Sequence, residues 1–260
     1  MKCYLCGNFK LDIRYFYDKP DKYLKTIGHS ISRRAWLYCP KCELYQNDNG
    51  LTEDELSRAY LQYRDGEMRG TTVAEEFHRI QILPLSENKL RVTWLYRYLN
   101  EARPLSMLDI GSGLGVFPCE MKLMVPNIYC IEPEPESAKF IQDELGISCF
   151  NGQYEKGIFS RVDFVTLVHV LEHIPDPIAF LRNIKETDLK SNGTLFIEVP
   201  DSGEFDYLPK EHDEFNSLHL WFFNISTLYR VVKRAGFIPH QIEWIRYKDR
   251  NLSRIRMLCR

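Results

Sequence analysis

The chain has 260 residues, of which 44% are hydrophobic and 27% are charged, and its formal net charge is −2. This length allows one α/β core with a small appended module, and the balanced charge gives no general reason to expect binding to nucleic acid or to an anionic membrane. Charged residues interrupt the first 30 positions, and no later apolar run approaches the length of a membrane span. We therefore expect a cytoplasmic protein with no membrane-spanning segment.

Two pairs of closely spaced cysteines lie near the start of the chain. The first C-x-x-C pair is Cys3 and Cys6, and the second is Cys39 and Cys42. Four thiolates at this spacing can close tetrahedrally on Zn²⁺, and they leave no open coordination position, which favours a structural ion over a catalytic one. Two unrelated reduced pairs, or an iron site, are the alternatives. The segment between the pairs would form a long hairpin with its aromatic side chains packed beneath the metal.

Helical patterns follow the cysteine-rich segment. Thr52 precedes three acidic residues, which is typical of an N-cap with an acidic first turn. A second helical pattern covers residues 73–100 and is broken near Pro84. We expect three domains: a zinc-binding module at 1–46, a helical linker and cofactor lid at 47–104, and a core at 105–260.

Strand and helix patterns alternate through the core. Strands are expected at 106–110, 128–132, 147–150, 162–168 and 194–199, with helices at 116–124, 135–145, 177–187 and 225–235. This alternation predicts an α/β fold with a parallel sheet and right-handed crossovers. Residues 237–245 and 253–259 are expected to form a hairpin at the end of the chain.

A glycine-rich turn follows the first core strand. Gly111, Gly113 and Gly115 are spaced G-x-G-x-G, whereas a dinucleotide-binding turn has the spacing G-x-G-x-x-G. Such a turn presents bare backbone to a ligand without the usual room for a diphosphate. Glu132 ends the second strand, where a carboxylate can accept hydrogen bonds from both hydroxyls of a ribose. The pattern therefore predicts a nucleoside ligand, whereas a simple helix-capping turn is the alternative for the glycines taken alone.

Four segments in this order resemble the motifs of class I S-adenosylmethionine-dependent methyltransferases: residues 108–115, 131–133, 168–177 and 193–200. The resemblance implies a Rossmann-like seven-stranded sheet with an antiparallel last strand, a small N-terminal zinc-ribbon-like module, and S-adenosylmethionine as cofactor. It assigns cofactor contacts to Asp109, Gly111, Gly113, Gly115, Glu132, Gln153 and His169. Gln153 stands where the family often has an acidic residue near the adenine.

Three histidines are candidates for chemistry. His169 and His173 follow the fourth core strand, at the edge where ligands bind in open α/β sheets. His219 lies in a stretch after the fifth strand that is too long and too aromatic for a simple connection. Residues 168–177 resemble a segment of sugar methyltransferases, in which a histidine at the position of His173 can act as the catalytic base. His219 is a second candidate base, and capping or packing roles are the alternatives for both.

The combination of a zinc module with a methyltransferase core resembles enzymes that methylate nucleotide-linked or surface-polysaccharide sugars. It implies a small-molecule sugar substrate and O-, N- or C-methylation. The alternative is an RNA- or protein-directed methyltransferase that uses the zinc module to bind its substrate, supported by C-terminal arginines that include Arg254 and Arg256. Basic residues on an edge strand are also an ordinary defence against edge pairing, so nucleic acid is not the expected partner.

Overall fold

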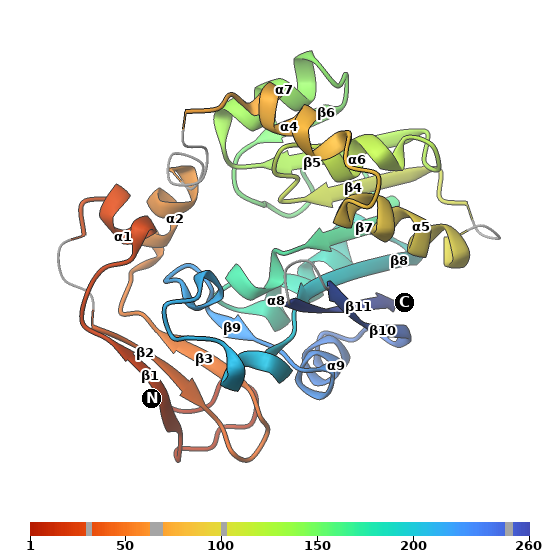
Figure 1. Cartoon of the computed structure of the whole chain (residues 1–260). Helices are drawn as coiled ribbons and strands as arrows, with labels where there is room; N and C mark the ends of the chain where they lie inside the picture. Colours follow the sequence, from red (N-terminus) through yellow and green to blue (C-terminus); the bar gives the residue numbers. More distant parts are fainter. Residues whose placement is uncertain (30–32, 63–69, 100–102, 248–251) are drawn as a thin grey trace. The chain divides into compact units, whose positions relative to one another are not determined.

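A computed structural model of the chain describes residues 1–29, 33–62, 70–99, 103–247 and 252–260 (Figure 1). The chain divides into two compact units. The glycine-turn unit comprises residues 67–168 and 183–195, and the cysteine unit comprises residues 1–66, 169–182 and 196–260. The domain boundaries expected after residues 46 and 104 stay predictions. In the described parts of the chain, no helix has both the length and the apolar character to cross a membrane.

The main sheet contains seven strands among the described residues, in the order β10-β11-β8-β7-β4-β5-β6. These strands are β4 (Ser106–Ile110), β5 (Asn127–Glu132), β6 (Ser148–Asn151), β7 (Val162–Val168), β8 (Leu189–Pro200), β10 (Pro239–Tyr247) and β11 (Leu252–Cys259). Strands β7, β4, β5 and β6 pair in parallel, whereas β10 and β11 are antiparallel. The predicted Rossmann-like sheet with an antiparallel end is confirmed.

The helices of the glycine-turn unit form where capping and apolar spacing predict them. They are α4 (Val73–Gln81), α5 (Glu87–Leu99), α6 (Val116–Met121) and α7 (Pro135–Asp143). Thr72 and Glu75 form a capping box at the start of α4, and the chain breaks around Pro84 as predicted. Phe77 of α4 packs in a buried cluster with Leu114 and Val116, which flank the third glycine of the turn. This packing fixes the outer side of the glycine-rich turn.

The cysteine unit contains a second sheet, in the order β1-β2-β3-β9. Its elements are β1 (Asp12–Tyr17), α1 (Lys22–Thr26), β2 (Arg34–Tyr38), β3 (Tyr45–Asp48), α2 (Glu53–Leu61), β9 (Trp221–Phe222) and α9 (Ile225–Arg234), with α8 (Pro177–Asn183) at its border and 3-10 turns at Leu171–His173, Ser202–Tyr207 and Asp213–Phe215. In Figure 1, β9 (blue) lies beside β3 (orange), although the two strands are far apart in the sequence.

The aromatic core of this unit differs from the expected one. Trp36 is fully buried, but it packs against Phe205, Phe215 and Phe222, which come from the later part of the chain. Phe16 of the N-terminal hairpin is 51% exposed. The expectation that the hairpin aromatics lie beneath the metal is therefore wrong in part, because the four-stranded sheet covers its apolar face with residues 205–222.

Candidate functional site

The glycine-rich turn leaves β4 in a left-handed conformation. Gly111, Gly113 and Gly115 have φ angles of 72°, 57° and 77°, a region that favours glycine. A Cβ atom on Gly115 would lie only 2.7 Å from side-chain atoms of Ile141 and Leu145. The third glycine is therefore required by the packing of the turn against the α7 region. The first two add no side chain to the turn, and their amides donate to the Ile131 carbonyl and the Glu132 carboxylate.

The Glu132 carboxylate contacts this turn. It is only 6% exposed, and its Oε2 atom accepts a hydrogen bond from the Gly113 amide at 2.6 Å. Its Oε1 atom accepts another from the Glu134 amide at 3.0 Å. A carboxylate has about four acceptor positions, and a bidentate contact with ribose hydroxyls is a type of bond that this group can make. The turn and this carboxylate together fit a nucleoside, as the spacing predicts.

Asp109 lies beneath the turn on β4. Its side chain accepts a hydrogen bond from the Thr166 hydroxyl on β7, with 2.5 Å between Oδ1 and Oγ1. The residue is 2% exposed, and burial raises the pKa of Asp109 to about 6, an effect that the Thr166 bond partly offsets. Gln153 follows β6 and is exposed, and its contact with an adenine stays a prediction.

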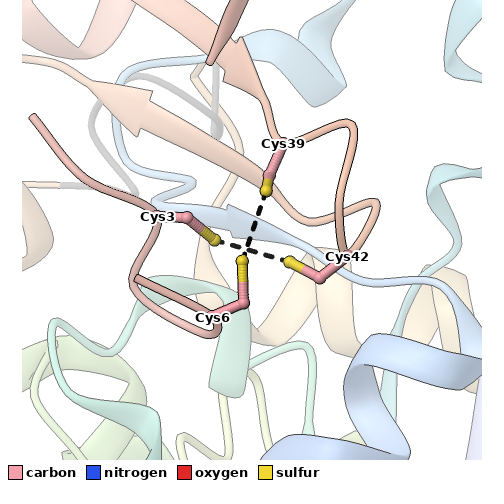
Figure 2. Close-up of side chains that lie close together, drawn as sticks. All are labelled: Cys3, Cys6, Cys39 and Cys42. Atoms are coloured by element: carbon pink, nitrogen blue, oxygen red, sulfur yellow. Dashed lines mark hydrogen bonds between the residues drawn. The ribbon is translucent and has the colours of Figure 1, made fainter. Parts of the chain in front are cut away.

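The four N-terminal cysteines converge in the cysteine unit (Figure 2). The Sγ atoms of Cys3 and Cys42 are 3.4 Å apart, and those of Cys6 and Cys39 are 3.5 Å apart. Both separations far exceed a disulfide bond of about 2.05 Å. Sulfur atoms on one zinc ion, each at about 2.3 Å, would lie roughly 3.8 Å apart in a tetrahedron. The cluster is therefore compatible with a zinc module.

Strand β9 connects the cysteine-rich sheet to His219. Tyr45 and Gln46 of β3 pair with the two residues of β9, and the Asn47 side chain donates a hydrogen bond to the His219 carbonyl at 2.8 Å. The Trp221 indole donates a bond of 2.7 Å to the Ile174 carbonyl. These contacts hold the segment that carries His219 beside the turn that carries His173.

His173 and His219 form a pair, with their ring centroids 4.7 Å apart. The Nδ1 atom of His173 lies 3.0 Å from the Leu218 carbonyl oxygen, and that of His219 lies 2.7 Å from the Glu214 carbonyl oxygen. A carbonyl only accepts, so each Nδ1 carries the proton in the bond. Burial and the neighbouring His219 lower the pKa of His173 to about 4, so this ring is neutral near pH 7 with its lone pair on Nε2.

A network of ion pairs lies next to the histidine pair. His169, at φ 56°, places its ring nitrogens 3.4 Å from carboxylate oxygens of Glu172 and Glu198. Burial opposes the charged imidazolium, but the two carboxylates outweigh it and raise the pKa of His169 to about 9. Arg256 donates to Glu198, with 2.5 Å between Nε and Oε2. The assignment of His169 to the cofactor stays a prediction.

The positions of two C-terminal arginines correct an expectation. Arg254 and Arg256 are 6% and 1% exposed, and β11 lies between β10 and β8 rather than at an edge of the sheet. Arg254 pairs with Glu214 at 3.2 Å. Both arginines balance buried carboxylates, so they are not available to bind phosphate groups. The sequence showed the periodic arginines but not their distant acidic partners.

Comparisons with known proteins agree with this fold. A family model described as a methyltransferase domain matches residues 82–242, which is more than half of the chain. No curated protein matches the chain. Among solved structures, 1,6-didemethyltoxoflavin-N1-methyltransferase from Burkholderia thailandensis, with bound S-adenosylhomocysteine, is 16% identical with a TM-score of 0.54, over 88% of this chain and 95% of that one.

Two further structures show how widely the fold is used. N-methyltransferase NodS from Bradyrhizobium japonicum is 12% identical with a TM-score of 0.52, over 66% of this chain and 94% of that one. The [4+2]-cyclase SpnF is 13% identical with a TM-score of 0.53, over 67% of this chain and 81% of that one. These likenesses show the fold alone, and activity follows from the family match. By that match, and with a turn and a carboxylate that fit a nucleoside, the chain belongs to the family of S-adenosylmethionine-dependent methyltransferases.

Proposed function

We propose that this methyltransferase acts on a small hydroxyl-rich molecule, namely a nucleotide-linked sugar or a sugar of a surface polysaccharide. The observation that carries the proposal is the side-by-side pair of His173 and His219, which is built into the same unit as the cysteine cluster. Two imidazoles suit the recognition and deprotonation of hydroxyl or amino groups. The Burkholderia neighbour is named for methylating a nitrogen of a small molecule, which agrees with a small acceptor.

The chain's own part in the reaction is to orient the acceptor and to take its proton. S-adenosylmethionine, when bound, supplies a methyl group on a positively charged sulfur. The acceptor oxygen or nitrogen would receive that methyl group, and the departing sulfur would keep the electron pair. The acceptor's proton passes to an imidazole Nε2. We rank His173 above His219 as this base because its ring is neutral and follows the end of β7 closely.

We also propose that Cys3, Cys6, Cys39 and Cys42 hold one structural zinc ion. Four sulfur ligands leave no position for a substrate, so the ion would act by fixing the fold of the N-terminal hairpin. None of the eight cysteines forms a disulfide bond. This supports a location in the reducing cytoplasm, where thiols persist.

The alternative of an RNA- or protein-directed enzyme has less support. Arg254 and Arg256, which motivated it, are buried in ion pairs with Glu214 and Glu198. Arg34 is also buried, and its guanidinium donates to the Phe215 carbonyl at 2.5 Å. A phosphate-binding surface needs exposed cationic groups, and these three side chains do not offer them.

The test is a methyl-transfer assay with isotope-labelled cofactor and a panel of nucleotide sugars, run beside total RNA and denatured protein. We expect label in a sugar product and one S-adenosylhomocysteine for each methyl transferred. His173→Ala should lower kcat by roughly 10²–10⁴ while S-adenosylhomocysteine affinity stays unchanged by calorimetry. The matched control is His240→Ala, an exposed histidine on β10. Label in RNA or protein with none in sugars would overturn the proposed substrate class.

A further inference from the structure

The cysteine unit contains a second group of side chains that could bind a metal ion. None of them is a cysteine. Glu172, His173 and His219 each offer a donor atom, and no two of these atoms are more than 4.8 Å apart. Two imidazoles with one carboxylate are a donor set for zinc, iron(II) and similar divalent ions. Two of the three residues are neighbours in one turn, and the segment around β9 brings in the third.

One nitrogen of each imidazole already has a partner. Each Nδ1–H is already engaged with a backbone carbonyl, of Leu218 for His173 and of Glu214 for His219. A histidine bound to a metal almost always donates its other ring N–H to a carbonyl or carboxylate, which fixes the tautomer and the direction of the ring. In both residues the nitrogen left for a ligand is Nε2.

The Glu172 carboxylate adds an independent observation. The residue is 1% exposed, and neither carboxylate oxygen has a hydrogen-bond donor in the described part of the chain. It has an ionic contact with His169 at 3.4 Å, and that imidazole is shared with Glu198. Buried carboxylates are normally paired, hydrogen-bonded or bound to a metal. A cation beside the two imidazoles would give Glu172 a second partner, in addition to the His169 imidazolium that it shares with Glu198.

We propose that Glu172, His173 and His219 form a second metal site, which binds one divalent transition-metal ion through one carboxylate oxygen and two Nε2 atoms. Three protein ligands leave coordination positions open, and adjacent hydroxyls of a sugar fit two such positions. The catalytic role of this ion rests on the proposed function. With the ion bound, both Nε2 lone pairs would be used in coordination, and the ion would replace the imidazole base of the proposed function: it would lower the pKa of the acceptor hydroxyl, whose proton would then leave to water.

The test is a titration with Mn²⁺ of full-length protein that carries one zinc ion per chain by elemental analysis, followed by the electron paramagnetic resonance signal of the free ion. Mn²⁺ prefers oxygen and nitrogen to thiolate ligands, so it does not compete for the four cysteines. We expect one Mn²⁺ per chain. Glu172→Gln, which keeps the shape of the side chain, and His219→Ala should each weaken binding by more than about 10-fold. His240→Ala should bind as the unchanged protein does.

Two controls separate this site from other causes. Elemental analysis should find the same zinc content in every variant, and circular dichroism should show the same fold. The second metal site is overturned if the unchanged protein does not bind Mn²⁺, or if Glu172→Gln and His219→Ala bind it as strongly as the unchanged protein does. Sugar methylation by protein stripped of all but the cysteine-bound ion also overturns its catalytic role and leaves His173 as the base. Mn²⁺ binding without methylation of any sugar supports the site and refutes the proposed substrate.

Discussion

The buried carboxyl group of Asp109 gives a quantitative test of the cofactor-binding half of the structure. Burial raises its pKa from 3.8 to about 6 in the folded protein. Because the folded-state pKa is the higher one, the protonated form favours folding, and this stability is lost as the pH rises from 3.8 through 6. At about 1.4 kcal/mol per pKa unit, the ionised carboxylate lowers the free energy of unfolding by about 3 kcal/mol at neutral pH. Asp109→Asn should therefore stabilise the protein.

The pH dependence distinguishes this cause from a change in packing. The amide oxygen of an asparagine still accepts the Thr166 hydrogen bond, so the variant removes the charge and keeps the contact. We expect its stability advantage in urea unfolding to grow by about 1.4 kcal/mol between pH 5 and pH 7.5. A difference that stays constant over this range would refute the reasoning.

Asp163 provides a control in the same unit, because its pKa is shifted in the opposite direction from that of Asp109. Although burial opposes its charge, Lys190 and the Ser106 hydroxyl lower the pKa of Asp163 below its ordinary value. Asp163→Asn should therefore be less stable than the unchanged protein, and more so at pH 7.5 than at pH 3. At Asp109, the buried carboxylate is charged at neutral pH although its charge lowers the stability of the protein. Such groups are typical of functional sites.

Three further predictions concern the turn, the ribose contact and the cysteine cluster. Glu132→Ala should weaken S-adenosylhomocysteine binding in calorimetry by roughly 10–100-fold, because charge-assisted hydrogen bonds contribute about 1.5–3 kcal/mol. Gly115→Ala should lower the midpoint of thermal unfolding, because the new methyl group would lie 2.7 Å from Ile141. Cys39→Ser should reduce the zinc content and abolish methyl transfer while cofactor affinity persists, because the proposed zinc ion would supply folding free energy to the hairpin that holds the segment of His219.

Each of these has a matched control. Glu136→Ala changes an exposed carboxylate on α7 and should leave cofactor affinity unchanged. Gly146 also has a left-handed backbone conformation, with φ at 60°, but a Cβ atom there would meet nothing within 4 Å. The extra loss of stability in Gly115→Ala, relative to Gly146→Ala, therefore measures the clash. Cys119→Ser should retain zinc. Loss of cofactor binding in Cys39→Ser would contradict an effect confined to the cysteine unit.

Local physics made most of the fold predictable from the sequence. Thr52 satisfies the amide of Glu55 in a capping box, and α2 begins at Glu53 as expected. Four of the five core strands lie within a residue or so of their expected bounds, because each is a short apolar run ended by a turn. Strand β8 begins at Leu189 rather than 194, because polar residues at its start pair in the sheet without an apolar signal. The turn expected at residues 248–251 lies outside the described residues.

The histidine site was predictable only in part. The positions of His173 and His219 after strands indicated the sheet edge, but nothing local indicates that their rings meet. Glu172 could have been found from its place in the H-x-x-E-H segment, whereas the pairing of Glu198 with Arg256 joins residues 58 apart in the sequence. Such contacts depend on the register of β8 and β11, which sequence patterns do not specify.

The cysteine cluster is part of the construction of the histidine site rather than an appendage to it. Cys39 and Cys42 lie in the connection between β2 and β3, so a bound ion would fix that hairpin. Strand β9 has only two residues, too few to hold a backbone in place without the pairing that β3 provides. Because His219 directly precedes this region, its position depends on the hairpin, and the hairpin depends on the cysteines. A methyltransferase core that lacked the module would keep its cofactor turn and lose one of its two imidazoles.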